Sequence, residues 1–249
     1  MQGVSFARGA TSSRGATQQD GAHTLDGARL TPLTFALICG GALGNLLFVA
    51  VYSIEGITRP GYVAWLQPIS ALSLGSGGWL QQVNFIVFGV LAILAAVGWR
   101  QALAPGRASV WYPLLRGVEG LGLIVDGVFS EDPTTGYPHG AVAPTIASAH
   151  GTIHSLVAVV AFLSLAISNF VLARRFWREA RWRAWAPFAV GVGVATIVLF
   201  VVFGSTIAHP GLPMGPGGLY ERLSTGVDLV FGWLVVLRLF TDRRRAANG

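Results

Sequence analysis

The sequence predicts an all-α polytopic membrane protein, a six-transmembrane-helix bundle with both termini in the cytoplasm. One observation is composition: 53% of the residues are hydrophobic and only 11% are charged, whereas a soluble domain has about 25% charged residues. With so few charges, lipid must solvate much of the surface. The other observation is that six long apolar stretches alternate with gaps that are, by turns, rich and poor in arginine.

Each apolar stretch is long enough to be a transmembrane helix, because about 20 helical residues cross a hydrocarbon core of about 30 Å. Tryptophan and tyrosine gather near the ends of these stretches, as in the aromatic belts of membrane proteins. The predicted spans are Thr31–Ile54, Gln81–Trp99, Trp111–Phe129, Ile146–Phe170, Trp185–Thr206 and Leu219–Phe240.

Arginine placement predicts the orientation. All 17 basic residues are arginine, and they cluster before the first span, after the second, between the fourth and fifth, and after the sixth. The other gaps hold only Arg59 and Arg222, and we count Arg116 with the cytoplasmic set. Cytoplasmic loops carry the excess of basic residues, so we expect N-in/C-in topology in a bacterial cytoplasmic (inner) membrane.

The domain organisation follows from the spans. We expect a disordered cytoplasmic tail over residues 1–30, a six-helix transmembrane domain over 31–240 and a basic cytoplasmic tail over 241–249. The pI near 10.4 does not indicate nucleic acid as a partner, because the arginines lie at helix ends, where they bind anionic headgroups. We expect membrane lipids as partners, and a partner membrane protein or a homo-oligomer as alternatives.

The outer loops differ from the inner ones. Residues 57–80 form a long segment that is too apolar for a solvated loop and too broken for a span, so we predict an interfacial or re-entrant segment. The other two outer loops, Ser130–Thr145 and Ala208–Gly218, are rich in proline and glycine.

Ionisable residues inside the spans predict a polar pocket. Such residues are costly in the bilayer unless they face a partner or water, and helical spacing places several of them on shared faces. Their depths put them in the outer half of the bilayer, so the pocket should open to the outside. Its predicted members are Glu119, Asp126, His150, His154, Asp228 and Asn45.

Three readings of the histidine pair remain open. His150 and His154 lie four residues apart and, with Asp126, could bind zinc through one helical face. Alternatively, the histidines hydrogen-bond the acids and tie the bundle together, or they relay protons. Glu221 and Arg222, at the outer start of the sixth span, are predicted to form an interfacial ion pair or to bind a lipid headgroup.

Several motifs resemble the bacterial membrane family called domain of unknown function 998 (DUF998). The resemblance covers about residues 33–240 and implies six helices with no established activity; the family is in turn distantly similar to eukaryotic six-helix proteins of the autophagy-modulator type. The motifs are Arg59-Pro60-Gly61-Tyr62, Ile69-Ser70, Gly77–Phe85, Gly127–Pro133, Gly136-Tyr137-Pro138, His150-Gly151-Thr152-Ile153-His154 and Glu221-Arg222-Leu223.

Three functions are therefore compatible with the sequence. The first is an integral membrane protein of unknown activity whose pocket binds a lipid headgroup or partner. The second is a metal-dependent hydrolase acting on an outer-leaflet lipid, in which zinc activates water and Ser70, Ser73 or Ser130 is a candidate nucleophile. The third is a proton-coupled small-molecule carrier that uses Glu119 and Asp228.

Overall fold

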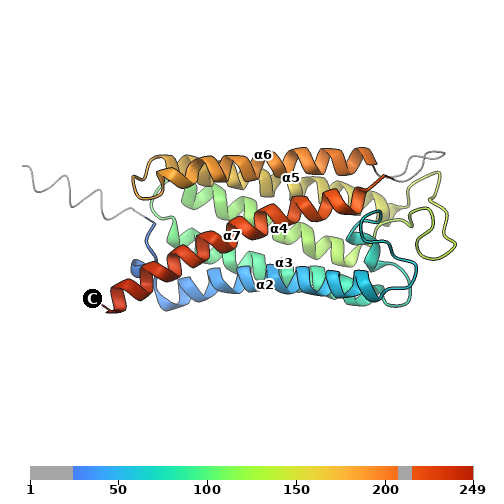
Figure 1. Ribbon diagram of the computed structural model, residues 1–249, viewed down its shortest axis with the longest axis horizontal. Coiled ribbons are helices and arrows are strands. Elements are labelled where there is room, and N and C mark those ends of the chain that lie inside the picture. The colour runs from blue at the N-terminus through green and yellow to red at the C-terminus, as the bar shows by residue number, and fades with distance from the viewer. Residues whose placement is uncertain (1–24, 207–214, 249) are drawn as a thin grey trace, which may run out of the picture.

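The computed structural model describes residues 25–206 and 215–248, and over these residues the chain forms one bundle of long helices (Figure 1). The six long helices agree in number and order with the predicted spans. They are α2 (Pro32–Thr58), α3 (Gly78–Ala102), α4 (Ala108–Val128), α5 (Ala149–Trp177), α6 (Ala186–Thr206) and α7 (Gly217–Asn248), and three short 3-10 helices accompany them, η2 (Gly27–Arg29), η3 (Ser70–Ser73) and η4 (Arg183–Trp185).

Local capping explains where two of the helices begin. The Thr31 side chain accepts a hydrogen bond from the Thr34 amide, and Pro32 occupies the first turn of α2, where its missing N–H costs nothing. Ser148 likewise accepts from the Gly151 amide at the start of α5. The Ser148 amide in turn donates to Asp132 Oδ2 at 2.8 Å, which fastens the preceding loop to the helix.

Each long helix packs against its neighbours in sequence, and α7 returns to pack against α2. In Figure 1, α7 crosses the front of the bundle diagonally. The α3–α4 contact is very close because Gly89 and Gly120 face each other: a Cβ atom added at Gly120 would lie 2.7 Å from the Gly89 carbonyl oxygen. Small residues allow this kind of approach between membrane helices.

The outside of the bundle is apolar, as lipid solvation requires. Large hydrophobic side chains are exposed along every long helix. Five of the described helices are long and apolar enough to cross a membrane, and α4 is not among them. The reason lies in its sequence, because α4 carries Arg116, Glu119 and Asp126.

The two ends of the bundle differ, and we name them by their residues. At the arginine-rich end, on the left in Figure 1, lie the C-terminus and the loops α3–α4 and α5–α6. At the capped end lie the α2–α3 and α4–α5 loops. Residues 59–77, which we call the cap, fold over this second end and bury Ile69, Ala71 and Leu72 against Phe48 and Phe85.

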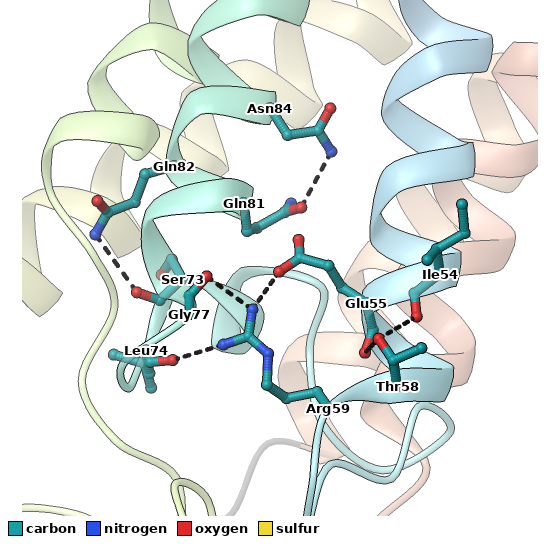
Figure 2. A network of polar contacts seen from close by, with 10 residues as sticks. All are labelled: Ile54, Glu55, Thr58, Arg59, Ser73, Leu74, Gly77, Gln81, Gln82 and Asn84. Atoms are coloured by element: carbon teal, nitrogen blue, oxygen red, sulfur yellow. Dashed lines mark hydrogen bonds and ion pairs between the residues drawn. The ribbon is translucent and has the colours of Figure 1, made fainter.

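Arg59 fixes the cap to the helices below it. Its guanidinium pairs with Glu55 on α2 and donates to the carbonyl oxygens of Leu74, at 3.2 Å, and Gly77, at 2.9 Å (Figure 2). The predicted interfacial or re-entrant segment is a compact cap in which residues 67–74 are buried.

The described residues of both predicted tails continue the folded bundle. The basic tail from residue 241 continues α7 as helix to Asn248. Residues 1–24 lie outside the described part of the chain, but Leu25 is fully buried and accepts a hydrogen bond from the Trp182 indole at 2.6 Å. The last residues of the predicted disordered tail therefore pack into the bundle, because Leu25 completes the core around Phe176 and Leu239.

Candidate functional site

A cavity of about 260 Å³ lies beneath the cap, in the half of the bundle nearest the capped end. Its walls are largely phenylalanine, and one side is acidic. Ile69 and Ser70 of the cap form its roof. The aromatic side chains are Phe48, Phe85, Phe88, Phe162, Phe200 and Phe203, and the acidic ones are Glu119, Asp126, Glu131, Glu221 and Asp228.

Asp126 and His154 form a pair on the cavity wall. His154 Nδ1 lies 2.8 Å from the Phe129 carbonyl oxygen and 3.4 Å from Asp126 Oδ1. Since the carbonyl can only accept, the nearer contact assigns the proton to Nδ1. The proton is thereby directed at Phe129, and Asp126 Oδ1 is a buried oxygen with no hydrogen-bond partner among the described residues.

Two further acids meet the cap at the same end of the cavity. Ser70 Oγ donates to Glu131 Oε2 at 2.6 Å, and the Ile69 amide donates to Glu221 Oε2 at 2.5 Å. Burial, with a contribution from the neighbouring carboxylates of Glu221 and Asp126, raises the pKa of Glu131 to about 8. Glu131 Oε1 is a second buried oxygen with no partner in the described structure.

At the opposite end of the cavity, a buried arginine bridges two carboxylates. Arg116 on α4 lies 3.1 Å from Glu119 and 3.2 Å from Asp228 on α7. Asn169 on α5 donates to the other Asp228 oxygen at 3.0 Å. This cluster joins three helices at mid-bundle. It corrects our assignment of Arg116 to the cytoplasmic arginines, because the side chain lies within α4 and turns inward to its acids.

The cavity reaches the bundle surface between α5 and α6. Three of its lining residues are exposed: Ser155 and Val159 on α5, and Gly204 on α6. Deeper along the same seam the two helices close, because Phe162 and Phe200 stack with ring centroids 4.2 Å apart. The opening is thus lateral, toward the apolar exterior, while the cap covers the end of the bundle.

The structure brings together most of the predicted pocket but not His150. Glu119, Asp126, His154, Asp228 and Asn45 all line the cavity. His150 is exposed and does not line it. Its ring instead packs against Phe129, with centroids 5.1 Å apart, because it lies at the first turn of α5, beyond the end of the cavity.

The predicted zinc ligands are consequently not assembled. Of Asp126, His150 and His154, only the first and third meet, and the described residues contain no group of three or more His, Cys, Asp or Glu side chains that could bind a metal ion. The candidate nucleophiles also stand apart from the histidine: Ser70 donates to Glu131, and none of the described serines hydrogen-bonds His154.

Glu221 and Arg222 contact the cap rather than each other. Arg222 donates to the Ala64 carbonyl at 2.5 Å and to the Tyr62 hydroxyl at 2.6 Å. Burial raises the Tyr62 pKa, so its hydroxyl keeps its proton and donates to the Pro68 carbonyl at 2.7 Å. The predicted Glu221–Arg222 ion pair does not form, and both side chains tie α7 to the cap.

Sequence reasoning missed Arg116, Glu131 and Asn169 as members of this site. Arg116 had a signal, since it is the one arginine near the middle of a predicted span and lies three residues before Glu119. Glu131 lies in the family motif Gly127–Pro133, but its contact with the cap could not be predicted, and Asn169 had no signal because its role depends on the approach of α5 to α7.

Comparison with known proteins places the chain in a family. The model of the family "Protein of unknown function (DUF998)" matches residues 42–239. The chain belongs to this family. No curated protein and no solved structure matches it significantly. With its membrane-length apolar helices, this member of the DUF998 family is a multi-pass membrane protein, and its cavity includes residues from most of the motifs that suggested the family.

Proposed function

We propose that the chain binds, beneath the cap, an amphipathic molecule with a protonated amine head and an apolar body, such as an amine-bearing lipid. The observation that carries this proposal is two buried oxygens that accept no hydrogen bond from the described residues, Asp126 Oδ1 and Glu131 Oε1, on the wall of a cavity with six phenylalanines. A buried acceptor without a donor costs about 1–3 kcal/mol, and an ammonium group supplies three N–H donors.

The charge of the cavity supports an amine over a purely anionic head. No arginine lines the cavity among the described residues. Arg116, which lies beside two of the lining acids, is already shared by Glu119 and Asp228. A phosphate group without an amine would therefore meet carboxylates and no available cation, which is unfavourable at low dielectric.

The lateral opening supports access from the membrane rather than from water. Its rim, at Val159 and Gly204, lies on helix faces that are otherwise apolar. In the orientation we propose, with six spans and both termini cytoplasmic, the opening faces the outer leaflet. The distribution of side chains on α4 supports its inclusion as one of six spans. Its charged side chains turn inward, while Leu114, Leu121 and Val128 are exposed on one outer face.

A binding measurement on the full chain in nanodiscs tests the proposal. A long-chain primary amine should bind at least about tenfold more tightly than the alcohol of equal length, the ratio expected for one charge-assisted hydrogen bond of about 1.5 kcal/mol or more. Asp126→Asn should remove this preference. Asp26→Asn, at the arginine-rich end, should keep it. Equal affinity for amine and alcohol would contradict the proposal.

A proton-coupled carrier is the second candidate, and the Arg116 cluster favours it. One guanidinium shared between Glu119 and Asp228 leaves one negative charge uncompensated, so a proton can compete for this site. In liposomes, a carrier would move protons with the amine. Asp228→Asn should then abolish that movement while the amine still binds. Binding without proton movement in the unmodified chain would exclude this candidate.

A further inference from the structure

A second, larger groove lies at the arginine-rich end, far from the capped cavity. Its volume is about 900 Å³, and seven arginines but only two carboxylates line it. It is built from three separate parts of the chain: the segment around η2, the α3–α4 loop and the end of α5 with the loop that follows. Such an excess of one charge in a concave site concentrates ions of the opposite sign.

Ion pairs and backbone hydrogen bonds hold these three parts in place. Arg175 pairs with Glu179 and donates to the Pro105 carbonyl at 3.0 Å, which ties the α3–α4 loop to α5. Arg181 pairs with Asp26 at 3.1 Å, which ties the N-terminal segment to the α5–α6 loop. The groove is therefore a prearranged surface, which lowers the entropy cost of binding.

Three of the other arginines that line the groove are available for a ligand. Arg107, Arg174 and Arg178 are exposed, and no carboxylate of the described residues lies within ion-pair distance of them. Guanidinium groups bind phosphate oxygens through paired N–H donors. Three of them on one groove match a phosphate-bearing headgroup.

The groove is also amphipathic, which separates a lipid from a soluble phosphate. Val171 and Trp111 line it beside the arginines, and the Trp111 side chain is 54% exposed. Tryptophan at this level is typical of the membrane interface. We propose that the groove binds one anionic phospholipid of the leaflet at the arginine-rich end, with its phosphate on Arg107, Arg174 and Arg178 and its acyl chain along Trp111 and Val171.

A binding experiment with matched charge removal tests this proposal. The purified full chain, in a neutral detergent, is titrated with phosphatidylglycerol or with phosphatidylcholine and bound lipid is counted by native mass spectrometry. We expect phosphatidylglycerol to bind with one strong site, and the double variant Arg174→Gln/Arg178→Gln to weaken that site by about tenfold or more. Arg174→Lys/Arg178→Lys should retain part of the affinity.

The control variant removes the same charge at the same end. Arg244 and Arg245 on α7 do not line the groove, so Arg244→Gln/Arg245→Gln should leave the strong site unchanged. Equal weakening by both double variants would show a diffuse surface potential and overturn the proposal. Competition by glycerol 3-phosphate as effective as by the intact lipid would identify a soluble phosphate site and overturn it as well. Unchanged thermal unfolding of the Gln variant ensures that loss of binding is not loss of fold.

Discussion

The capped end and the arginine-rich end of the bundle handle charge in opposite ways. Among the described residues, the capped end holds two arginines, Arg59 and Arg222, and both donate hydrogen bonds to the cap. Its acids are buried, and two of them keep unpartnered oxygens on a cavity wall. At the arginine-rich end, the acids are paired and several arginines are exposed.

This difference in charge is the basis of the two binding proposals, a cation at the capped end and an anionic lipid at the arginine-rich end. A buried carboxylate is costly unless a donor reaches it, so the capped end favours a cation or a proton. An exposed arginine costs little and attracts anions from the headgroup layer. Two concave surfaces of opposite charge thus lie at the two ends of one helix bundle, and the Arg116 cluster lies between them.

The largest expected effect compares two arginines that each bridge two carboxylates. Arg116 does so at mid-bundle, with its side chain 16% exposed, whereas Arg181 bridges Asp26 and Asp242 with its side chain 38% exposed. Arg116→Met should lower the free energy of unfolding by about 3–5 kcal/mol, since it strands two buried acids. Arg181→Met should cost about 1 kcal/mol.

Denaturant unfolding in detergent measures both changes. Adding Glu119→Gln and Asp228→Asn to Arg116→Met should recover part of the loss, because the stranded charges are removed. Similar losses for the two single variants would show that burial does not distinguish the two ends.

The next effect concerns the attachment of the cap. Arg222→Ala removes charged donors from the Ala64 carbonyl and the Tyr62 hydroxyl, each worth about 1.5–3 kcal/mol when buried. Hydrogen exchange of amides in residues 62–74 should therefore accelerate, while exchange in the α5–α6 loop stays unchanged. If Arg244→Ala at the other end accelerated cap exchange equally, the cap would not depend on Arg222.

A narrower test addresses the lateral opening. Val159 and Val160 are neighbours on α5, 43% and 52% exposed, but only Val159 lines the cavity. Val159→Trp should weaken binding of the long-chain amine by about tenfold, the loss of about 1.4 kcal/mol. Val160→Trp should not change it. If the two variants bound the amine equally well, the amine would not enter the cavity past Val159.

A last effect is a pH dependence at the cap, spread over several pH units. Because burial raises the Glu131 pKa from 4.5 to about 8, the folded state binds a proton that the unfolded state has already lost between these pH values. Stability should therefore fall as pH rises from about 4.5 to about 8, by at most about 1.4 kcal/mol per pH unit for one proton. The thermal stability of Glu131→Gln should lack this fall with pH. If stability falls with pH as steeply in the variant as in the unmodified chain, Glu131 has an ordinary pKa.

The helices were predictable because their signal is local. An apolar stretch of membrane length predicts a span whatever surrounds it, and all six long helices fall on the predicted stretches. Helical spacing also grouped Glu119, Asp126, His150, His154 and Asp228 as a pocket, and all of these except His150 line the cavity.

What the sequence could not predict depends on contacts between distant segments. The apolar composition of the cap indicated that it would not be a solvated loop, but its attachment through Arg59 and Arg222 to its own carbonyl oxygens depends on contacts that composition does not reveal. His150 shares a helical face with His154 but lies one turn nearer the start of α5. Helical spacing alone therefore did not exclude it from the pocket. Leu25 was assigned to a tail because a single apolar residue gives no periodic signal.

Photolabelling tests the central claim most directly. A photoreactive long-chain amine is added to the full chain in nanodiscs, and the labelled peptides are mapped. The account predicts labels on cavity residues such as Leu123, Phe162 and Phe200, which are lost in Asp126→Asn and after addition of unlabelled amine. Labels spread over lipid-facing positions such as Leu46 and Val194, unchanged by Asp126→Asn, would contradict it.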